Sequence, residues 1–128
     1  MSAKSAVSIQ DLRKAIETRN AASLKAYYAP NAELTIIDSD NPPSKPRTLK
    51  GTAEIGAFLD DVYSRDMIHT LDMGVRSDGH LAFVQGCKYT DGTRVIASSV
   101  AEVGPQGITK QTTGQAGDNE TSFSGNVR

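Results

Sequence analysis

The sequence predicts an α+β fold in which three helices precede a run of long antiparallel strands. Apolar residues recur at helical spacing in the first half of the chain, and they alternate with polar residues in four segments of the second half. The length of 128 residues suits a single hydrophobic core. We therefore expect one domain over residues 1–116, with a flexible lead at 1–7 and a mobile C-terminal tail at 117–128.

Two helices are expected near the N-terminus. The apolar stripe of the first consists of Ile9, Leu12 and Ile16. Ser8 is its expected N-cap, since a serine side chain can accept a hydrogen bond from a free backbone N–H of the first turn. The second helix is short, over residues 24–28, with Ser23 as its cap. It ends before Pro30, because the residue preceding a proline avoids the helical conformation.

A strand, a loop and a third helix follow. Residues 32–37 are rich in β-forming side chains, and the prolines after them predict a long exposed loop up to Lys50. Thr52 is the expected N-cap of the third helix, which ends near Ser64. Four antiparallel strands are then predicted over residues 67–75, 81–89, 95–103 and 108–116, separated by turns rich in glycine.

Composition excludes several classes of function. A net charge of −1 leaves no basic surplus for a nucleic acid, and no apolar run is long enough to cross a membrane. With one cysteine and two histidines, neither a disulfide nor a metal site is expected. Without a hydrophobic leader segment, the sequence predicts a soluble, cytoplasmic protein. We expect no cofactor.

The order of these elements, with four local motifs, resembles the nuclear transport factor 2-like superfamily. The motifs are residues 19–24, 27–34, 49–55 and 107–111, and the likeness covers residues 8–116. This superfamily includes SnoaL-like polyketide cyclases, ketosteroid isomerases and limonene epoxide hydrolases. The resemblance to a SnoaL-like domain implies a cone-shaped, cystatin-like, mostly antiparallel sheet wrapped on three helices. It also implies a cavity for a small, largely apolar organic ligand, and a homodimer.

Strand parity predicts which side chains of residues 81–89 face that cavity, and matching the turns to the ketosteroid isomerase pattern extends the same face to the last two strands. Two tyrosines of the short helix and the polar residues of the inward strand faces are the candidate ligand-binding residues, namely Tyr27, Tyr28, Gln85, Cys87, Tyr89, Ser99, Gln111, Thr113 and Gln115. A buried amide without a partner costs about 1–3 kcal/mol, so water, a ligand or one another must satisfy these groups. The alternative is that the parity is shifted by one residue and that they face solvent.

Asp38 and His69 are the candidate catalytic residues. His69 shares a strand face with Met67, Leu71, Met73 and Val75, and Asp38 has the parity of the inward residues of its own strand. A carboxylate and an imidazole across a cavity can move a proton in a cofactor-free isomerase, cyclase or hydratase. The alternatives are a core histidine and a turn aspartate. Lys45, Arg47 and Lys50 make the loop after Pro43 locally basic. This favours a solvated loop, and the alternative is a contact with an anionic ligand or partner.

The mechanisms of two related enzymes do not fit this chain. The resemblance to ketosteroid isomerases places their tyrosine and two aspartates at Ala15, Ile36 and Ser99, none of which has the required side chain. Likewise, residues 85–87 lack the Arg-x-Asp motif of limonene epoxide hydrolases. An acid–base enzyme of another kind therefore remains one hypothesis. The other is a non-catalytic ligand-binding or assembly module, whose outward Val84, Ile96 and Val100 pack on a partner or a second copy.

Overall fold

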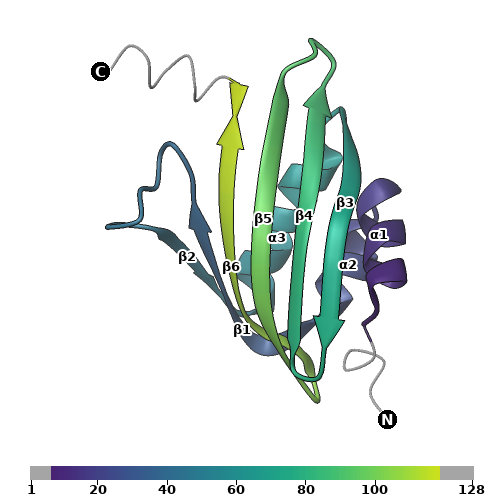
Figure 1. The fold of residues 1–128 in the computed structure, drawn as a ribbon. Coiled ribbons are helices and arrows are strands. Elements are labelled where there is room, and N and C mark those ends of the chain that lie inside the picture. The colour runs from purple at the N-terminus through teal and green to yellow at the C-terminus, as the bar shows by residue number, and fades with distance from the viewer. Residues whose placement is uncertain (1–6, 119–128) are drawn as a thin grey trace.

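The sheet of this protein has six strands, and its last strand lies inside it. The structure is a computed structural model that describes residues 7–118 (Figure 1). Its elements are α1 (Ile9–Glu17), α2 (Ala21–Ala26), β1 (Tyr28–Ile37), β2 (Arg47–Lys50), α3 (Gly51–Ser64), β3 (Met67–Ser77), β4 (His80–Tyr89), β5 (Arg94–Gly104) and β6 (Gly107–Gly117). The strand order is β2-β1-β6-β5-β4-β3.

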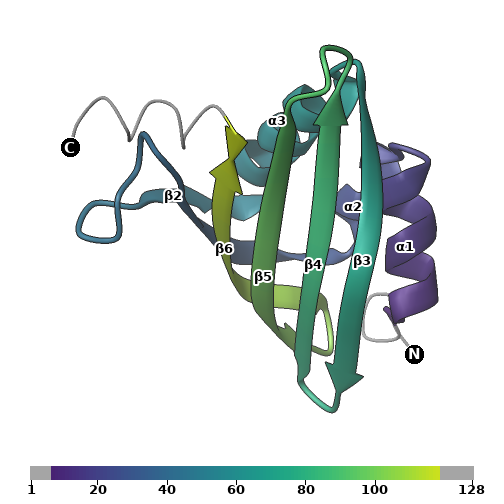
Figure 2. The ribbon, with the colours of Figure 1, turned by 45° about the horizontal axis from the view of Figure 1, so that its top comes forward.

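The predicted α+β class is confirmed. Strands β3 to β6 pair antiparallel in sequence order, β1 and β2 form an antiparallel pair, and β1 runs parallel to β6. The sheet is curved, and all three helices lie on one of its faces (Figure 2). None of the helices within residues 7–118 is long and apolar enough to cross a membrane.

The first two helices differ from the prediction at their junction. Ser8 caps α1 as predicted, because its hydroxyl accepts a hydrogen bond from the backbone N–H of Asp11 at 3.0 Å. Helix α2, however, begins at Ala21 and is capped by Asn20 rather than by Ser23. Arg19 has a positive φ of 54°. This left-handed conformation, which glycine usually adopts after the last turn of a helix, ends α1. The next residue, Asn20, is then in place to cap α2.

The region around β2 and α3 also needs correction. Strand β1 begins at Tyr28, four residues before the predicted start, and its irregular pairing with β6 accommodates Pro30. The predicted loop up to Lys50 contains the short strand β2, which pairs with β1. Helix α3 has no side-chain cap from Thr52. Instead, Glu54 accepts a hydrogen bond from the backbone N–H of Lys50 at 2.8 Å.

A bulge in β3 changes which side chains face the helices. Met67, His69 and Leu71 are buried as predicted, whereas Met73 and Val75 are 64% and 68% exposed. The register shifts between Leu71 and Met73, which inserts one extra residue and reverses the parity beyond it. A second shift, between Glu102 and Val103 of β5, leaves Ile108 of β6 buried and its neighbour Thr109 exposed.

The core lies between the helices and the concave face of the sheet. Its most deeply buried large side chains are Ile16, Leu34, Ile36, Ile55, Leu81 and Ile108. Val7, the first described residue, is also buried, and the Asp118 carboxylate accepts a hydrogen bond from the backbone N–H of Arg94 at 3.0 Å. Residues 1–6 and 119–128, which make up most of the predicted lead and tail, lie outside the described residues.

Candidate functional site

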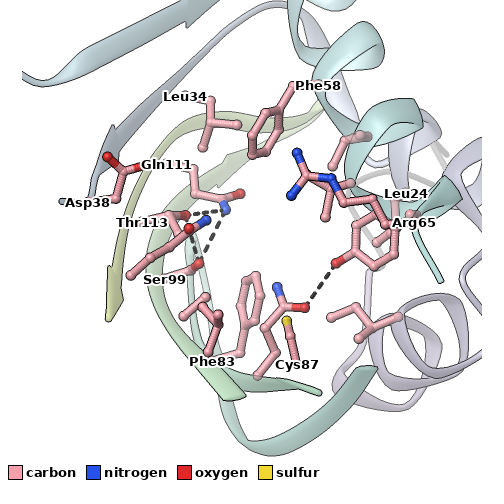
Figure 3. Close-up of a pocket in the computed structure, with 18 of the residues that line it drawn as sticks. Leu24, Leu34, Asp38, Phe58, Arg65, Phe83, Cys87, Ser99, Gln111 and Thr113 are labelled. Atoms are coloured by element: carbon pink, nitrogen blue, oxygen red, sulfur yellow. Dashed lines mark hydrogen bonds between the residues drawn. The ribbon is translucent and has the colours of Figure 1, made fainter. Parts of the chain in front are cut away.

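A pocket of about 360 Å³ lies between the helices and the concave face of the sheet (Figure 3). On the helix side, the apolar lining consists of Leu24 and of side chains from the second half of α3, such as Phe58 and Val62. On the sheet side, it consists of Leu34 and Phe83. Figure 3 shows Phe58 and Arg65 on one side of this space and Ser99, Gln111 and Thr113 on the other. The volume is within the range typical of sites for small organic ligands.

All nine candidate ligand-binding residues line this pocket. They are Tyr27 and Tyr28 beside α2, Gln85, Cys87 and Tyr89 on β4, Ser99 on β5, and Gln111, Thr113 and Gln115 on β6. Ser99, Gln111 and Thr113 are 3%, 5% and 7% exposed, so the alternative that these side chains face solvent is wrong. Their role toward a ligand stays a prediction.

Four of these side chains form a hydrogen-bonded network, which we call the polar floor: Tyr28, Ser99, Gln111 and Thr113. The Tyr28 hydroxyl donates to Oε1 of Gln111 at 2.7 Å. The Gln111 Nε2 donates to Oγ1 of Thr113 at 3.0 Å and to Oγ of Ser99 at 3.4 Å. Ser99 and Thr113 share a further hydrogen bond of 2.8 Å between their hydroxyls. The polar side chains therefore satisfy one another.

One hydroxyl hydrogen of the polar floor is not used in the hydrogen bonds of the network. Ser99 and Thr113 carry two hydroxyl hydrogens between them, and one of these makes the hydrogen bond that joins the two residues. Gln111 uses its amide hydrogens on the same two oxygens. Whichever hydroxyl accepts in the shared bond is thus free to donate into the pocket. A ligand that meets the floor gains most if it presents an acceptor oxygen there.

Tyr63 is a pocket residue that the sequence interpretation missed. Its hydroxyl donates to Oε1 of Gln85 at 3.0 Å, and its side chain is 7% exposed. Burial raises the pKa of Tyr63 and of Tyr28 well above the usual value, so both phenols keep their protons and act as donors. The signal was present in the sequence, because Ile55, Leu59 and Tyr63 recur at intervals of four on one helix face.

His69 lies behind the pocket wall and is not one of its lining residues. The imidazole is 2% exposed, its Nδ1 is 3.4 Å from Sγ of Cys87, and its ring centroid is 4.5 Å from that of Tyr63. Burial lowers the pKa of His69, and this outweighs the opposite effect of the nearby Gln85 side chain. The ring's Nε2 has no hydrogen-bond partner within residues 7–118. The ring is therefore neutral at physiological pH.

The burial of His69 predicts a specific loss of stability in acid. Below pH 6.5 the unfolded chain takes up a proton that the folded protein resists, so the stability is complete above that pH and falls as the pH falls. We expect His69→Phe to reduce the decline in the free energy of unfolding between about pH 7.5 and pH 5, measured by urea titration. The same substitution at exposed His80 is the matched control. Equal declines in the two variants would contradict the assignment.

The structure does not bring Asp38 and His69 to one cavity. Asp38 lies at the margin of the pocket (Figure 3), and its Oδ1 accepts three hydrogen bonds of 2.8–3.0 Å from Asp40 and Asn41. This carboxylate closes the turn after β1, which is the alternative that the sequence left open. His69 lies beside Cys87 and lines a separate pocket with Glu17 and Tyr89, so Asp38 and His69 do not share a cavity. Their catalytic roles stay predictions that this geometry does not support.

Two arginines line the pocket as well. Arg47 is in β2 rather than in a solvated loop, and its guanidinium carbon lies 5.6 Å from the ring centroid of Phe58. Arg65 follows α3 directly and donates to the carboxylate of Asp61 at 2.7 Å and to the hydroxyl of Tyr89 at 3.3 Å. Among residues 7–118, no group of three or more histidine, cysteine or acidic side chains could hold a metal ion.

Solved structures show which fold this is. No protein-family model and no curated protein matches the sequence. A nuclear transport factor 2-like protein of unknown function from Mesorhizobium loti superposes with a TM-score of 0.72 at 12% identity, covering 90% of this chain and 93% of that one. A protein of Kribbella flavida, provisionally named a ketosteroid isomerase, superposes with a TM-score of 0.68 at 15% identity, covering 84% and 73%.

A third neighbour agrees with these two. An uncharacterised protein of Silicibacter pomeroyi with a cystatin-like fold superposes with a TM-score of 0.69 at 12% identity, covering 89% of this chain and 77% of that one. The chain therefore has the nuclear transport factor 2-like, cystatin-like fold, as the resemblance in its sequence implied. Because unrelated activities share this fold, the function has to be argued from the pocket.

Proposed function

We propose that the protein binds a small, largely apolar organic ligand in its pocket without catalysing a reaction on it. The observation that carries the proposal is the polar floor, a buried hydrogen-bonded network that shares the pocket with apolar side chains of the helices. A pocket of about 360 Å³ with a few convergent polar groups is the usual form of a small-molecule site. The provisional name of the Kribbella neighbour is compatible with such a ligand.

Binding is favoured over proton transfer by the ionisation of the groups inside the pocket. A general base works best when its pKa lies near the operating pH. Burial raises the pKa of both buried tyrosines, and it raises the pKa of the Cys87 thiol to about 11. These three groups stay protonated at neutral pH. The isomerase, cyclase or hydratase hypothesis is left without its proposed acid–base pair, so we propose the binding role.

The proposal predicts that filling the pocket abolishes binding. Ala97 is 4% exposed and lines the pocket from β5. We expect Ala97→Phe to lower the affinity for acetylnaphthalene, a two-ring ketone, by at least about tenfold because its ring takes up the ligand's space. Affinity is measured by isothermal titration calorimetry, and thermal unfolding shows that the variant is folded.

The matched control places the same side chain on the opposite face of the sheet. Ala82 pairs with Val100 on the outer face, so Ala82→Phe adds a phenyl ring without entering the pocket. This variant is expected to bind acetylnaphthalene as the parent protein does. Unchanged affinity in folded Ala97→Phe would overturn the proposed function, as would a failure of acetylnaphthalene, acetylnaphthoate and naphthoate all to bind the parent protein.

The homodimer and the cytoplasmic location stay predictions. The surface that a dimer would use is the outer face of the sheet, where the exposed large hydrophobic side chains are Ile68, Met73, Val75, Ile96 and Val100. Two of these were predicted to face inward, and the bulge in β3 turned them outward. The outer face is thus more apolar than the sequence alone indicated, which supports the prediction of an assembly surface.

A further inference from the structure

Two cationic side chains, Arg47 and Arg65, border the pocket beside Phe58. Arg65 lies opposite Ser99, Gln111 and Thr113 in Figure 3, beside Phe58. Arg47 stacks over the same Phe58 ring, at 5.6 Å from its centroid. We call these two arginines and the phenylalanine the pocket mouth. The pocket therefore has hydrogen-bond donors at two separated places, with apolar side chains between them.

Arg47 has no ion-pair partner in the described part of the chain. The three ion pairs within residues 7–118 join Arg13 to Glu17, Lys25 to Asp60, and Arg65 to Asp61. The guanidinium of Arg47 is held by Phe58 through a cation–π contact, which leaves its N–H groups free to donate. A planar fork of this kind matches the geometry of a carboxylate.

Arg65 is paired, but its partner is easily replaced. The Arg65 and Asp61 side chains are 45% and 63% exposed, and an exposed ion pair of this type contributes about 0–1 kcal/mol. The Asp61 carboxylate does not line the pocket and can return to water. Tyr89, which accepts a hydrogen bond from the same guanidinium, keeps the arginine at the pocket while its other N–H groups remain available.

The acidic side chains near the mouth do not cancel this preference. Asp38 and Asp40 line the pocket, so its formal charges balance. The Asp38 charge, however, is spread over three N–H donors of its own turn, and neither aspartate forms an ion pair with Arg47 or Arg65 within residues 7–118. The Asp40 side chain is exposed, and its carboxylate makes no hydrogen bond or ion pair within residues 7–118. The two guanidiniums, in contrast, lie against side chains of the pocket lining, Arg47 against Phe58 and Arg65 against Tyr89, so a ligand in the pocket can supply their acceptors.

We propose that the ligand is an organic carboxylate with a second, neutral acceptor oxygen at its far end. The neutral oxygen accepts a hydrogen bond from the free hydroxyl of the Ser99–Thr113 pair, and the carboxylate binds Arg47 and Arg65 at the mouth. The apolar body lies between Leu24, Leu34 and Phe83. This inference rests on the proposed function and adds the chemical class of the ligand.

Three related probes test it. Acetylnaphthoate carries both groups, acetylnaphthalene only the ketone, and naphthoate only the carboxylate. We expect acetylnaphthoate to bind at least about tenfold more tightly than either of the others in low salt, measured by calorimetry. The advantage over acetylnaphthalene is expected to shrink at about 0.5 M salt, because partly exposed charge pairs are screened.

Substitutions at the pocket mouth test whether the two arginines cause the higher affinity for acetylnaphthoate. In the double variant Arg47→Gln/Arg65→Gln, the ratio of acetylnaphthoate to acetylnaphthalene affinity is expected to fall to about one, since glutamine keeps donors but removes the charge. Arg94→Gln is the matched control, because Arg94 lies on the far side of the sheet and does not line this pocket. It removes one positive charge and is expected to keep the ratio.

The outcomes separate this inference from the proposed function. If acetylnaphthalene binds as tightly as acetylnaphthoate, or if the advantage persists in the double variant, the carboxylate assignment is overturned and the proposed binding function stands. If acetylnaphthoate gains nothing over naphthoate, the polar floor does not recognise the ketone and the two-ended ligand is overturned. If none of the three probes binds, the proposed function fails.

Discussion

Gln111→Leu is expected to lower the free energy of unfolding by about 2 kcal/mol, because it removes the buried hydrogen bond from the Tyr28 hydroxyl and the two that the amide donates to Ser99 and Thr113. The two side chains are joined by a hydrogen bond of 2.7 Å, and both are almost fully buried. Leucine has a similar size, so the cost comes from the lost hydrogen bonds rather than from a cavity. Urea denaturation at neutral pH measures it.

A double-mutant cycle isolates the network from the packing. Tyr28→Phe removes the donor, and in the Gln111→Leu background it is expected to cost less than in the parent protein because the hydrogen bond between the two side chains is already gone. Thr112→Leu, which alters the exposed neighbour on the other face of β6, is the control and should cost much less. Additive losses in the cycle would show that the two side chains are not coupled.

Tyr63→Ala is expected to have a still larger effect, about 3–5 kcal/mol in the free energy of unfolding. The Tyr63 ring packs 4.5 Å from the imidazole of His69, and its hydroxyl donates to Gln85. Its removal opens a cavity beside the pocket and uncovers the buried histidine. Urea denaturation measures the loss of stability. The fluorescence quenching of a bound naphthalene probe shows whether the pocket is still formed.

Tyr63→Phe separates the ring from the hydroxyl. It keeps the packing on His69 and loses only the hydrogen bond to Gln85, so the expected cost is about 1 kcal/mol. Similar losses in Tyr63→Phe and Tyr63→Ala would contradict the view that the ring stabilises this wall. A loss below about 1 kcal/mol in Tyr63→Ala would show that the site collapses around the missing ring.

Much of the fold could be predicted because hydrophobic spacing reports directly on local structure. Helices α1 and α3 and the four-strand meander follow from such spacing. The errors arose where the local structure depends on the backbone conformation rather than on the spacing of hydrophobic residues. The bulge before Met73 and the left-handed Arg19 are conformations that tertiary packing selects, and no residue type in the sequence marks them. Strand β2 is too short to show a period.

The candidate site was predictable in part. Strand parity placed Gln85 on the pocket side, and the family resemblance extended the same face to Ser99 and Gln111, which succeeded because their strands are regular there. It could not place Asp38 and His69 relative to each other, since that distance depends on the curvature of the sheet and on where β1 ends. Parity along a strand says which face a side chain takes, but says nothing of which neighbours cover it.

The position of β6 within the sheet has a consequence for how the protein is made. Strand β6 lies between β1 and β5, and it supplies Gln111 and Thr113 to the polar floor. During synthesis, β1 and β2 leave the ribosome long before the strand that joins them to the rest of the sheet. The polar floor cannot be complete before β6 pairs with β1 and β5, and this pairing depends on contacts distant in sequence.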